Sequence, residues 1–123
     1  MRFDCTMTYC WYYFFLVSDN PAITLLSVIN GNEIGENDTV IVQCKVEGNP
    51  LSKMKWTFEN KTLIEGNHGV RQSNYTIQSA KCVDTGIYMC TATNIINMNS
   101  YSDTRVVQIS VKCKYIPLTF YKT

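Results

Sequence analysis

The sequence predicts an all-β fold, a sandwich of two sheets built from antiparallel strands. Apolar and polar residues alternate over several short segments, which is the period-two pattern of strands that bury one face. Cys44 and Cys90 flank a tryptophan, Trp56, and Tyr88 lies two residues before the second cysteine. This order and spacing are typical of a sandwich with a tryptophan in its core.

The alternation predicts five main strands, each with an inward face of apolar residues. They cover residues 39–48, 53–58, 74–80, 86–93 and 104–112. Their inward residues are Val40, Val42, Cys44, Val46, Met54, Trp56, Phe58, Tyr75, Ile77, Tyr88, Cys90, Ala92, Val107, Ile109 and Val111. A further strand is expected within 22–29, with a second half after Gly31. The interval between 58 and 74 has room for two further short strands, which we call C′ and D in chain order.

The run Asp84–Cys90, read together with Cys44 and Trp56, resembles the immunoglobulin superfamily, most closely its I-set. The resemblance covers residues 21–112 and implies an immunoglobulin-like, two-sheet Greek-key sandwich. It also implies that a Cys44–Cys90 disulfide joins the sheets, that Trp56 lies on this disulfide, and that Tyr88 fixes the corner before its strand.

The same resemblance implies further structural roles. Asp84 and Gly86 belong to the shared run, and Arg71 stands where many immunoglobulin domains have an arginine that pairs with the aspartate. We therefore expect an Arg71–Asp84 ion pair at one end of the sandwich.

The cysteine content indicates an oxidising compartment, because the chain has six cysteines in 123 residues and cytosolic thiols are kept reduced. Cys82 precedes strand 86–93 and Cys113 follows its antiparallel neighbour 104–112, so both are expected at the same end. A second disulfide between them is predicted, and the alternatives are a free Cys82 or a Cys113 that bridges to a following domain. Metal binding is not expected, since the sequence has no Cys-x₂-Cys spacing and one histidine.

The two ends of the chain are predicted to lie outside the domain. The apolar run 9–17 has the length of the hydrophobic part of a secretory signal, so residues 1–18 are predicted to be a signal peptide. Asp4 and Leu16 depart from the usual signal pattern, and a fragment boundary is the alternative. Residues 113–123 are expected to be a tail or the start of a linker. No other segment is long and apolar enough to be predicted as a membrane span.

Three sequons of the Asn-x-Thr type begin at Asn37, Asn60 and Asn74. Each is a predicted glycosylation site in a secreted protein. Asn37 and Asn60 are expected in loops, whereas Asn74 is expected to begin a strand.

Several classes of function are not expected from this sequence. The net charge is +1 with both signs interspersed, which does not favour binding to nucleic acid or to an anionic membrane. His68 lies in a glycine-flanked segment without a catalytic motif, and no glycine-rich phosphate loop is present. We predict no enzymatic activity, no metal and no cofactor.

Two groups of apolar residues are candidate contacts for a partner protein. Ile87 and Met89 are predicted to lie side by side on the outward face of their strand, although isolated surface hydrophobes are common. The second group lies in the connection 94–103 and consists of Ile95, Ile96, Met98 and Tyr101. This connection lacks the glycine of the usual I-set turn, so Asn97 or Asn99 is expected to adopt a positive φ.

We predict an extracellular recognition or adhesion module that binds another protein, including a second copy of itself. The run that includes Cys82 is similar to those of multi-immunoglobulin adhesion and matrix proteins of the hemicentin kind. The alternative is a structural spacer with no ligand of its own, and a third hypothesis is an accessory module of a larger extracellular enzyme.

Overall fold

The computed structural model describes residues 18–29, 31, 33–66 and 69–113, and nearly all of these form strands or tight turns. The strands are β1 (Asp19–Val28), β2 (Ile34–Gly35), β3 (Val40–Asn49), β4 (Lys53–Phe58), β5 (Lys61–Ile64), β6 (Gln72–Ile77), β7 (Gly86–Ile96), β8 (Asn99–Ile109) and β9 (Val111–Lys112). A 3₁₀ turn, Cys82–Asp84, precedes β7. Residues 1–17 of the predicted signal segment and 114–123 of the predicted tail lie outside the described residues.

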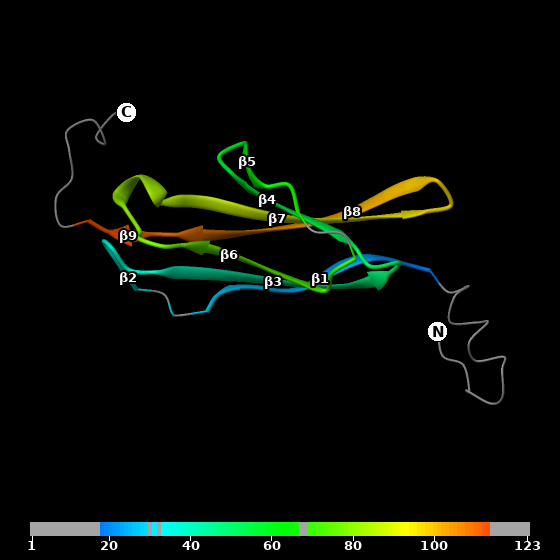
Figure 1. Cartoon of the computed structure of the whole chain (residues 1–123), viewed down its shortest axis with the longest axis horizontal. Helices are drawn as coiled ribbons and strands as arrows, with labels where there is room; N and C mark the ends of the chain where they lie inside the picture. The colour runs from blue at the N-terminus through cyan, green and yellow to red at the C-terminus, as the bar shows by residue number, and fades with distance from the viewer. Residues whose placement is uncertain (1–17, 30, 32, 67–68, 114–123) are drawn as a thin grey trace.

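Two layers of antiparallel strands form the sandwich (Figure 1). One layer has the strand order β1-β3-β6, and the other has the order β5-β4-β7-β8. Short strands β2 and β9 pair in parallel at one end, so the chain after β1 crosses to the second layer. The predicted all-β sandwich is confirmed, and β2 is the expected second half of the first strand.

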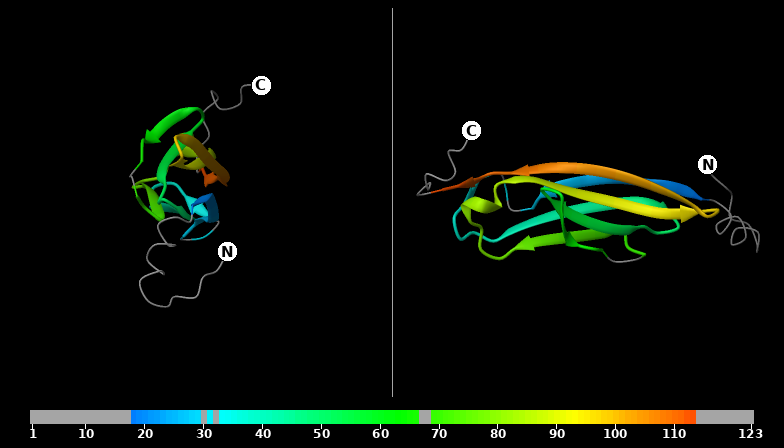
Figure 2. Two further views of the ribbon diagram at one scale, coloured as in Figure 1. Left: turned by 90° about the vertical axis from the view of Figure 1, so that its right-hand side faces the viewer. Right: turned by 90° about the horizontal axis from the view of Figure 1, so that it is seen from above.

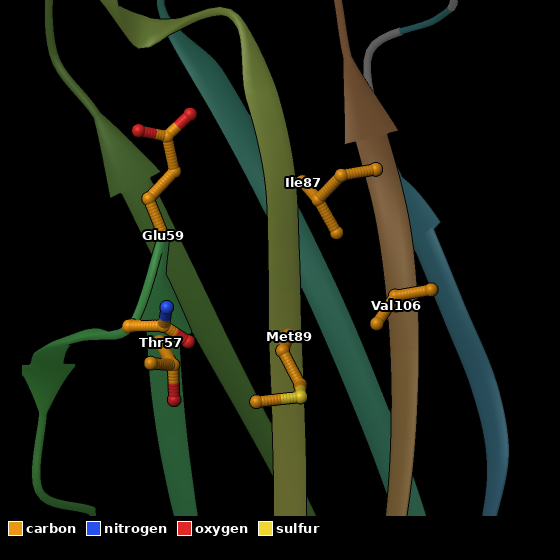
Figure 3. A pocket seen from close by; sticks show the side chains of 6 residues that line it. Thr57, Glu59, Ile87, Met89 and Val106 are labelled. Atoms are coloured by element: carbon orange, nitrogen blue, oxygen red, sulfur yellow. The ribbon is translucent and has the colours of Figure 1, made fainter.

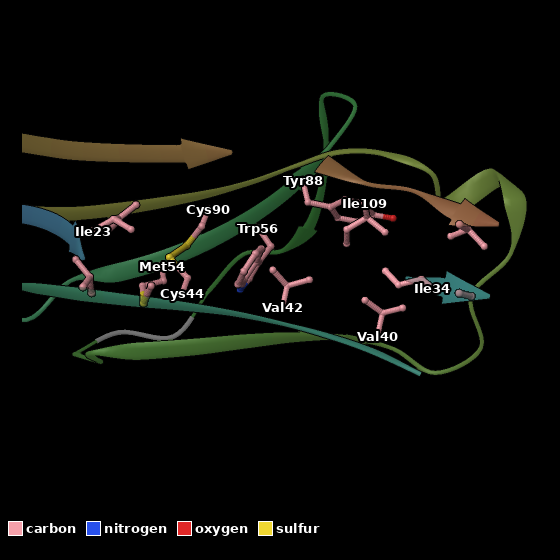
Figure 4. Packing of buried hydrophobic residues seen from close by; sticks show 14 residues of the cluster. Ile23, Ile34, Val40, Val42, Cys44, Met54, Trp56, Tyr88, Cys90 and Ile109 are labelled. Atoms are coloured by element: carbon pink, nitrogen blue, oxygen red, sulfur yellow. A yellow bond between two sulfur atoms is a disulfide. The ribbon is translucent and has the colours of Figure 1, made fainter. Parts of the chain in front are cut away.

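The core lies between the layers and contains the inward faces of β3, β4 and β7. Trp56, Cys44 and Cys90 are fully buried, and a disulfide joins the two cysteines across the layers. Figure 4 shows Trp56 beside this disulfide, with the apolar residues of β3 continuing the core. The indole Nε1 of Trp56 donates a hydrogen bond of 2.9 Å to Ser73 Oγ on β6, so the one polar atom of this side chain is satisfied.

Strand D, for which the interval before β6 has room, is absent from the described residues. Among residues 65, 66 and 69–71, which the structure describes between β5 and β6, Val70 forms an isolated bridge with Ser52. The Val70 amide donates to the Ser52 carbonyl at 3.2 Å, and the Arg71 carbonyl accepts from the Val46 amide at 2.9 Å. The Arg71–Val46 bond continues the β3–β6 pairing by one residue beyond the Lys45–Gln72 pair, so Arg71 extends β6 and does not form a separate strand beside it. The layer of β1, β3 and β6 has three strands in the part of the chain that the structure describes.

Strands β7 and β8 are longer than predicted. The interval 94–103 was expected to be a loop, but pairing continues without interruption to the Ile96–Asn99 pair. The connection is therefore a hairpin that lies at the end of the sandwich where β1 begins (Figure 2).

Candidate interaction surface

The β7–β8 hairpin closes through a two-residue turn, Asn97–Met98. Both residues have positive φ, 51° and 67° respectively, as a type I′ turn requires. Asn97 adopts this conformation readily, and Met98 does so against its preference. Of the two asparagines proposed from the sequence, Asn97 is thus the one with positive φ, and Asn99 is the first residue of β8.

Exposed apolar side chains occur at the end of this hairpin on both of its faces, since Ile95 is opposite Ser100 and Tyr101 is opposite the buried Asn94. Met98 is 97% exposed and Ile95 is 65% exposed, while Tyr101 is 36% exposed and Ile96 is half-buried. We refer to Ile95, Met98 and Tyr101 as the hairpin end. Contact sites on soluble domains are marked by neighbouring exposed apolar side chains, which makes the hairpin end a candidate contact.

The base of the hairpin is held by buried polar contacts. Asn94, 4% exposed, donates from Nδ2 to the carbonyl of Asp19 at 2.9 Å and to the carbonyl of Pro50 at 3.0 Å. On the other strand, Asp103 Oδ2 accepts from the Ile23 amide at 2.7 Å. The hairpin is therefore anchored to β1 and to the β3–β4 connection, which orients its exposed end.

Paired hydroxyl groups occupy the outer face next to the hairpin end. Thr93 and Ser102 are 2.8 Å apart at their oxygens, and Thr91 and Thr104 are 3.3 Å apart. Cross-strand pairs of this kind stabilise the ladder and leave a polar strip on the face. This strip separates the hairpin end from a second apolar group, which lies on β7 and β8 farther from the turn.

The second apolar group contains Ile87, Met89 and Val106. Ile87 is 46% exposed and Val106 is 58% exposed, and Met89 is opposite Val106 in the β7–β8 register. With Thr57 they line a hollow of about 180 Å³, which we call the lower hollow (Figure 3). Val106 was missed by the sequence reasoning, although the alternation that places Val107 inward also places Val106 outward.

Glu59 and Asn60 complete the rim of the lower hollow. Thr57 lies on the outer face of β4, but its neighbours cover it and it is only 8% exposed. Its Oγ1 has no hydrogen-bond partner among the described residues.

The cysteines and aromatic residues singled out in the sequence lie in structural positions. A second disulfide joins Cys82 to Cys113 at the end of the sandwich opposite the hairpin. The Tyr88 hydroxyl donates to the Asp84 carbonyl at 2.6 Å, which fixes the corner that leads into β7. Burial raises the pKa of Tyr88 well above its ordinary value, with a further contribution from Asp84, and burial raises the pKa of Tyr75 as well.

The expected Arg71–Asp84 ion pair is absent among the residues that the structure describes. Gln72 pairs with Lys45 at one end of β6, and Ile77 pairs with Val40 at the other. Arg71 precedes the first end and Asp84 follows the second, so β6 separates them. Asp84 Oδ2 instead accepts from the Lys81 amide at 2.8 Å.

Gly86 permits a close contact between β7 and β4. A Cβ atom at this position would lie 2.6 Å from Cε1 of Phe58. The Phe58 ring stacks on Tyr88 with centroids 4.3 Å apart, so it has little freedom to move away.

The three sequon asparagines are exposed but differ in their contacts. Asn37 Oδ1 accepts from Ser79 Oγ at 3.2 Å, and Asn74 Oδ1 accepts from Gln72 Nε2 at 3.5 Å. Asn60 lies in the β4–β5 turn, where Glu59 and Asn60 have φ values of 47° and 66°. Asn74 lies within β6 and not at its start.

In the part of the chain that the structure describes, no group of histidine, cysteine, aspartate and glutamate side chains is arranged to hold a metal ion. The ion pairs Lys53–Glu65 at 3.6 Å and Lys112–Glu33 at 3.5 Å are exposed, so they contribute little to stability. Among the described residues, no helix has the length and apolar character of a membrane span.

Residues 20–94 match the family model described as immunoglobulin domain. The chain is similar to vascular endothelial growth factor receptor 2 of Danio rerio, with 33% identity over 73 residues, which is 57% of this chain and 5% of the receptor. It is also similar to vascular cell adhesion protein 1 of Homo sapiens, with 30% identity over 91 residues, covering 72% of this chain and 12% of that protein. The cell adhesion molecule DSCAM of Homo sapiens is 26% identical over 92 residues, covering 67% of this chain and 5% of DSCAM.

Solved structures of titin domains share the fold. A chimeric titin Z1Z2 matches with a TM-score of 0.66 and 17% identity, covering 80% of this chain and all of that one. The complex of titin M10 with the obscurin-like 1 immunoglobulin domain matches with a TM-score of 0.65 and 15% identity, covering 81% of this chain and all of the matched one. The matched family model covers more than half of the sequence, and the sandwich, its core tryptophan and its tyrosine corner agree with it. The chain therefore belongs to the immunoglobulin domain family.

Proposed function

We propose that this chain is an extracellular protein–protein recognition module and that it binds its partner through the hairpin end. The observation that carries this proposal is the 97% exposure of Met98 beside the 65% exposure of Ile95, on a hairpin with a buried polar base. A rigid base lowers the entropic cost of ordering apolar residues at a contact. The similar proteins include a growth factor receptor and two adhesion molecules, which supports a role in recognition.

The partner is another protein, and a second copy of this chain is one candidate. Ile87 and Met89, predicted as contacts together with the hairpin residues, lie on the same pair of strands beyond the polar strip. The hairpin end is the more exposed of the two groups, and we assign the partner contact there.

A test compares binding of the multivalently displayed domain to a panel of extracellular domains that includes this chain itself. Ile95→Ser/Met98→Ser should weaken binding by about tenfold or more, because truncated hot-spot residues typically cost at least 2 kcal/mol. Ile96 is left unchanged since it is half-buried. The matched control is Ile29→Ser/Val83→Ser, which removes two side chains of 51% and 61% exposure away from the hairpin. Equal binding by the hairpin variant and the wild type would remove the hairpin end from the proposal.

A structural spacer is the second candidate function. The chain corresponds to between 5% and 12% of the length of the similar receptor and adhesion proteins, so domains like it occur as single units of long chains. Absence of binding to every member of the panel, itself included, would favour the spacer.

A further inference from the structure

The lower hollow combines an apolar wall, a buried hydroxyl group without a partner, and a sequon asparagine on its rim. We propose that it holds the first N-acetylglucosamine of an N-linked glycan attached to Asn60. This inference rests on the proposed extracellular function, because the glycan is added in the secretory pathway.

Asn60 differs from the other two sequon asparagines in its surroundings. It follows Glu59 in the tight β4–β5 turn, where Phe58 pairs with Lys61. Its side chain makes no hydrogen bond with the described part of the chain, whereas those of Asn37 and Asn74 each accept one. Of the three, Asn60 alone lines the lower hollow. A sugar joined to its amide therefore starts at the rim.

The lining of the hollow suits a sugar ring better than an apolar side chain. Ile87, Met89 and Val106 form the apolar wall, which fits the C–H face of a pyranose. Thr57 is more than nine-tenths buried, and its Oγ1 has no partner among the described residues. Figure 3 labels this side chain together with Ile87, Met89 and Val106. A buried hydroxyl left unpaired is costly, and a purely apolar occupant would leave it so. The hydroxyl and acetamido groups of N-acetylglucosamine supply a hydrogen-bond partner.

Two other buried side-chain oxygens also lack a partner among the described residues, Ser52 Oγ and Asn94 Oδ1. Neither residue lines the lower hollow. Thr57 is thus the one such group that lines the lower hollow. The proposed contact with the sugar requires a movement of Met89, the flexible side chain that is opposite Thr57 in the β4–β7 register.

Glycosylation of Asn60 transfers a glycan from a lipid-linked donor to the side-chain amide. A bond forms between Asn60 Nδ2 and C1 of the sugar, and the bond from C1 to the diphosphate of a lipid-linked oligosaccharide donor breaks. The lipid diphosphate leaves with the electron pair of that bond, the amide gives up one proton, and nothing is oxidised or reduced.

A bound sugar would cover Ile87, Met89 and Val106 and leave the hairpin end uncovered. The two apolar groups on β7 and β8 would then have different occupants. Glycosylation at Asn60 would direct a partner protein to the hairpin end and away from the lower hollow.

Methionine oxidation offers a direct test, since the reaction follows solvent access. The full chain is secreted from a host that makes oligomannose glycans, and the glycans are trimmed with an endoglycosidase that leaves a single N-acetylglucosamine. After brief exposure to hydrogen peroxide, peptide mapping gives the sulfoxide fraction at Met89 and at Met98, which is 97% exposed and serves as the internal reference. We expect several-fold slower oxidation of Met89 relative to Met98 in the single-sugar protein than in the Thr62→Val variant, which loses the sequon but keeps Asn60 and the turn.

Asn74→Gln is the matched control, because it removes a different sequon and should leave Met89 protected. Equal oxidation of Met89 with and without the sugar at Asn60, or an unoccupied Asn60 in a secreted protein, overturns the inference. The proposed function would survive both results, since partner binding by the hairpin end is measured separately. Retention of the chain in the cell would count against both.

A second variant tests the hydroxyl group. Thr57→Val removes it with little change of shape, so it should raise the Tm of the protein without a sugar at Asn60 and lower the Tm of the single-sugar protein. A shift of the same sign in both forms would show that the sugar does not bind Thr57 and would overturn the assignment.

Discussion

Removal of the Cys82–Cys113 disulfide should lower the stability of the domain substantially. This bridge ties the 3₁₀ turn before β7 to the residue that follows β9, and β9 itself pairs with β2 over two residues only. The cysteines are 31 residues apart, and the chain-entropy treatment of such a loop gives about 3.7 kcal/mol of stabilisation at 25 °C. For a domain of this size that corresponds to a loss of roughly 15–30 °C in Tm.

The measurement is urea denaturation of the Cys82→Ala/Cys113→Ala variant and of the wild type without reductant, followed by far-ultraviolet circular dichroism. A neighbouring exposed substitution, Val83→Ala, is the control for local effects and should change the free energy of unfolding by less than about 0.5 kcal/mol. A loss below about 1 kcal/mol in the double variant would refute the reasoning, because the bridge would then not restrict the unfolded chain as its loop length requires.

Three further substitutions test the corner, the close contact and the turn. Tyr88→Phe should lower the free energy of unfolding by about 1 kcal/mol, because the hydrogen bond to the Asp84 carbonyl is lost. A tyrosine whose pKa is raised in the folded state makes the free energy of unfolding decrease as the pH rises above the unfolded-state pKa, by up to about 1.4 kcal/mol per pH unit. The variant should therefore lose less stability than the wild type above about pH 10. Gly86→Ala should lower the free energy of unfolding by about 1–3 kcal/mol, because the added methyl group meets the Phe58 ring; an unchanged urea midpoint would contradict that contact. Met98→Gly should raise stability by about 1 kcal/mol at a residue with φ of 67° and should weaken partner binding, and stronger binding would contradict the proposed contact.

The alternation of apolar residues was enough to predict that the five main strands exist and which of their faces points inward, but not where each strand begins and ends. Val40, Val42 and Met54 are fully buried, and each belongs to a segment whose period is two. The burial of Trp56 against the disulfide followed from the family spacing. These features depend on side-chain chemistry along one strand at a time, which a sequence displays directly.

The missing strand D and the length of the hairpin depend on backbone partners, which a sequence does not display. Nothing in the residue types of Val70 and Arg71 shows that their backbone groups bond to the β3–β4 end. The Arg71–Asp84 pair was therefore expected from the family and is not formed. The Asn97–Met98 turn lacks the glycine that usually marks a two-residue hairpin, so the interval was interpreted as a loop.

The candidate contact residues could be selected from the sequence because they are apolar. The residues that surround them could be identified only from the structure. Ile95, Met98 and Tyr101 were selected because they are apolar within a predicted connection. The polar strip, the half-buried position of Ile96 and the hollow under Asn60 arise from the register of three strands. A one-residue shift of that register would reverse which side chains face outward, and the pattern alone does not determine it across the sheet.

Non-reducing peptide mapping with intact mass, on protein secreted from a eukaryotic host, tests the central claim that this is an extracellular domain of the immunoglobulin family. The account predicts that the chain reaches the medium, that Cys44 is linked to Cys90 and Cys82 to Cys113, and that Asn60 carries a glycan. A chain retained inside the cell with free thiols and no added sugar would contradict it.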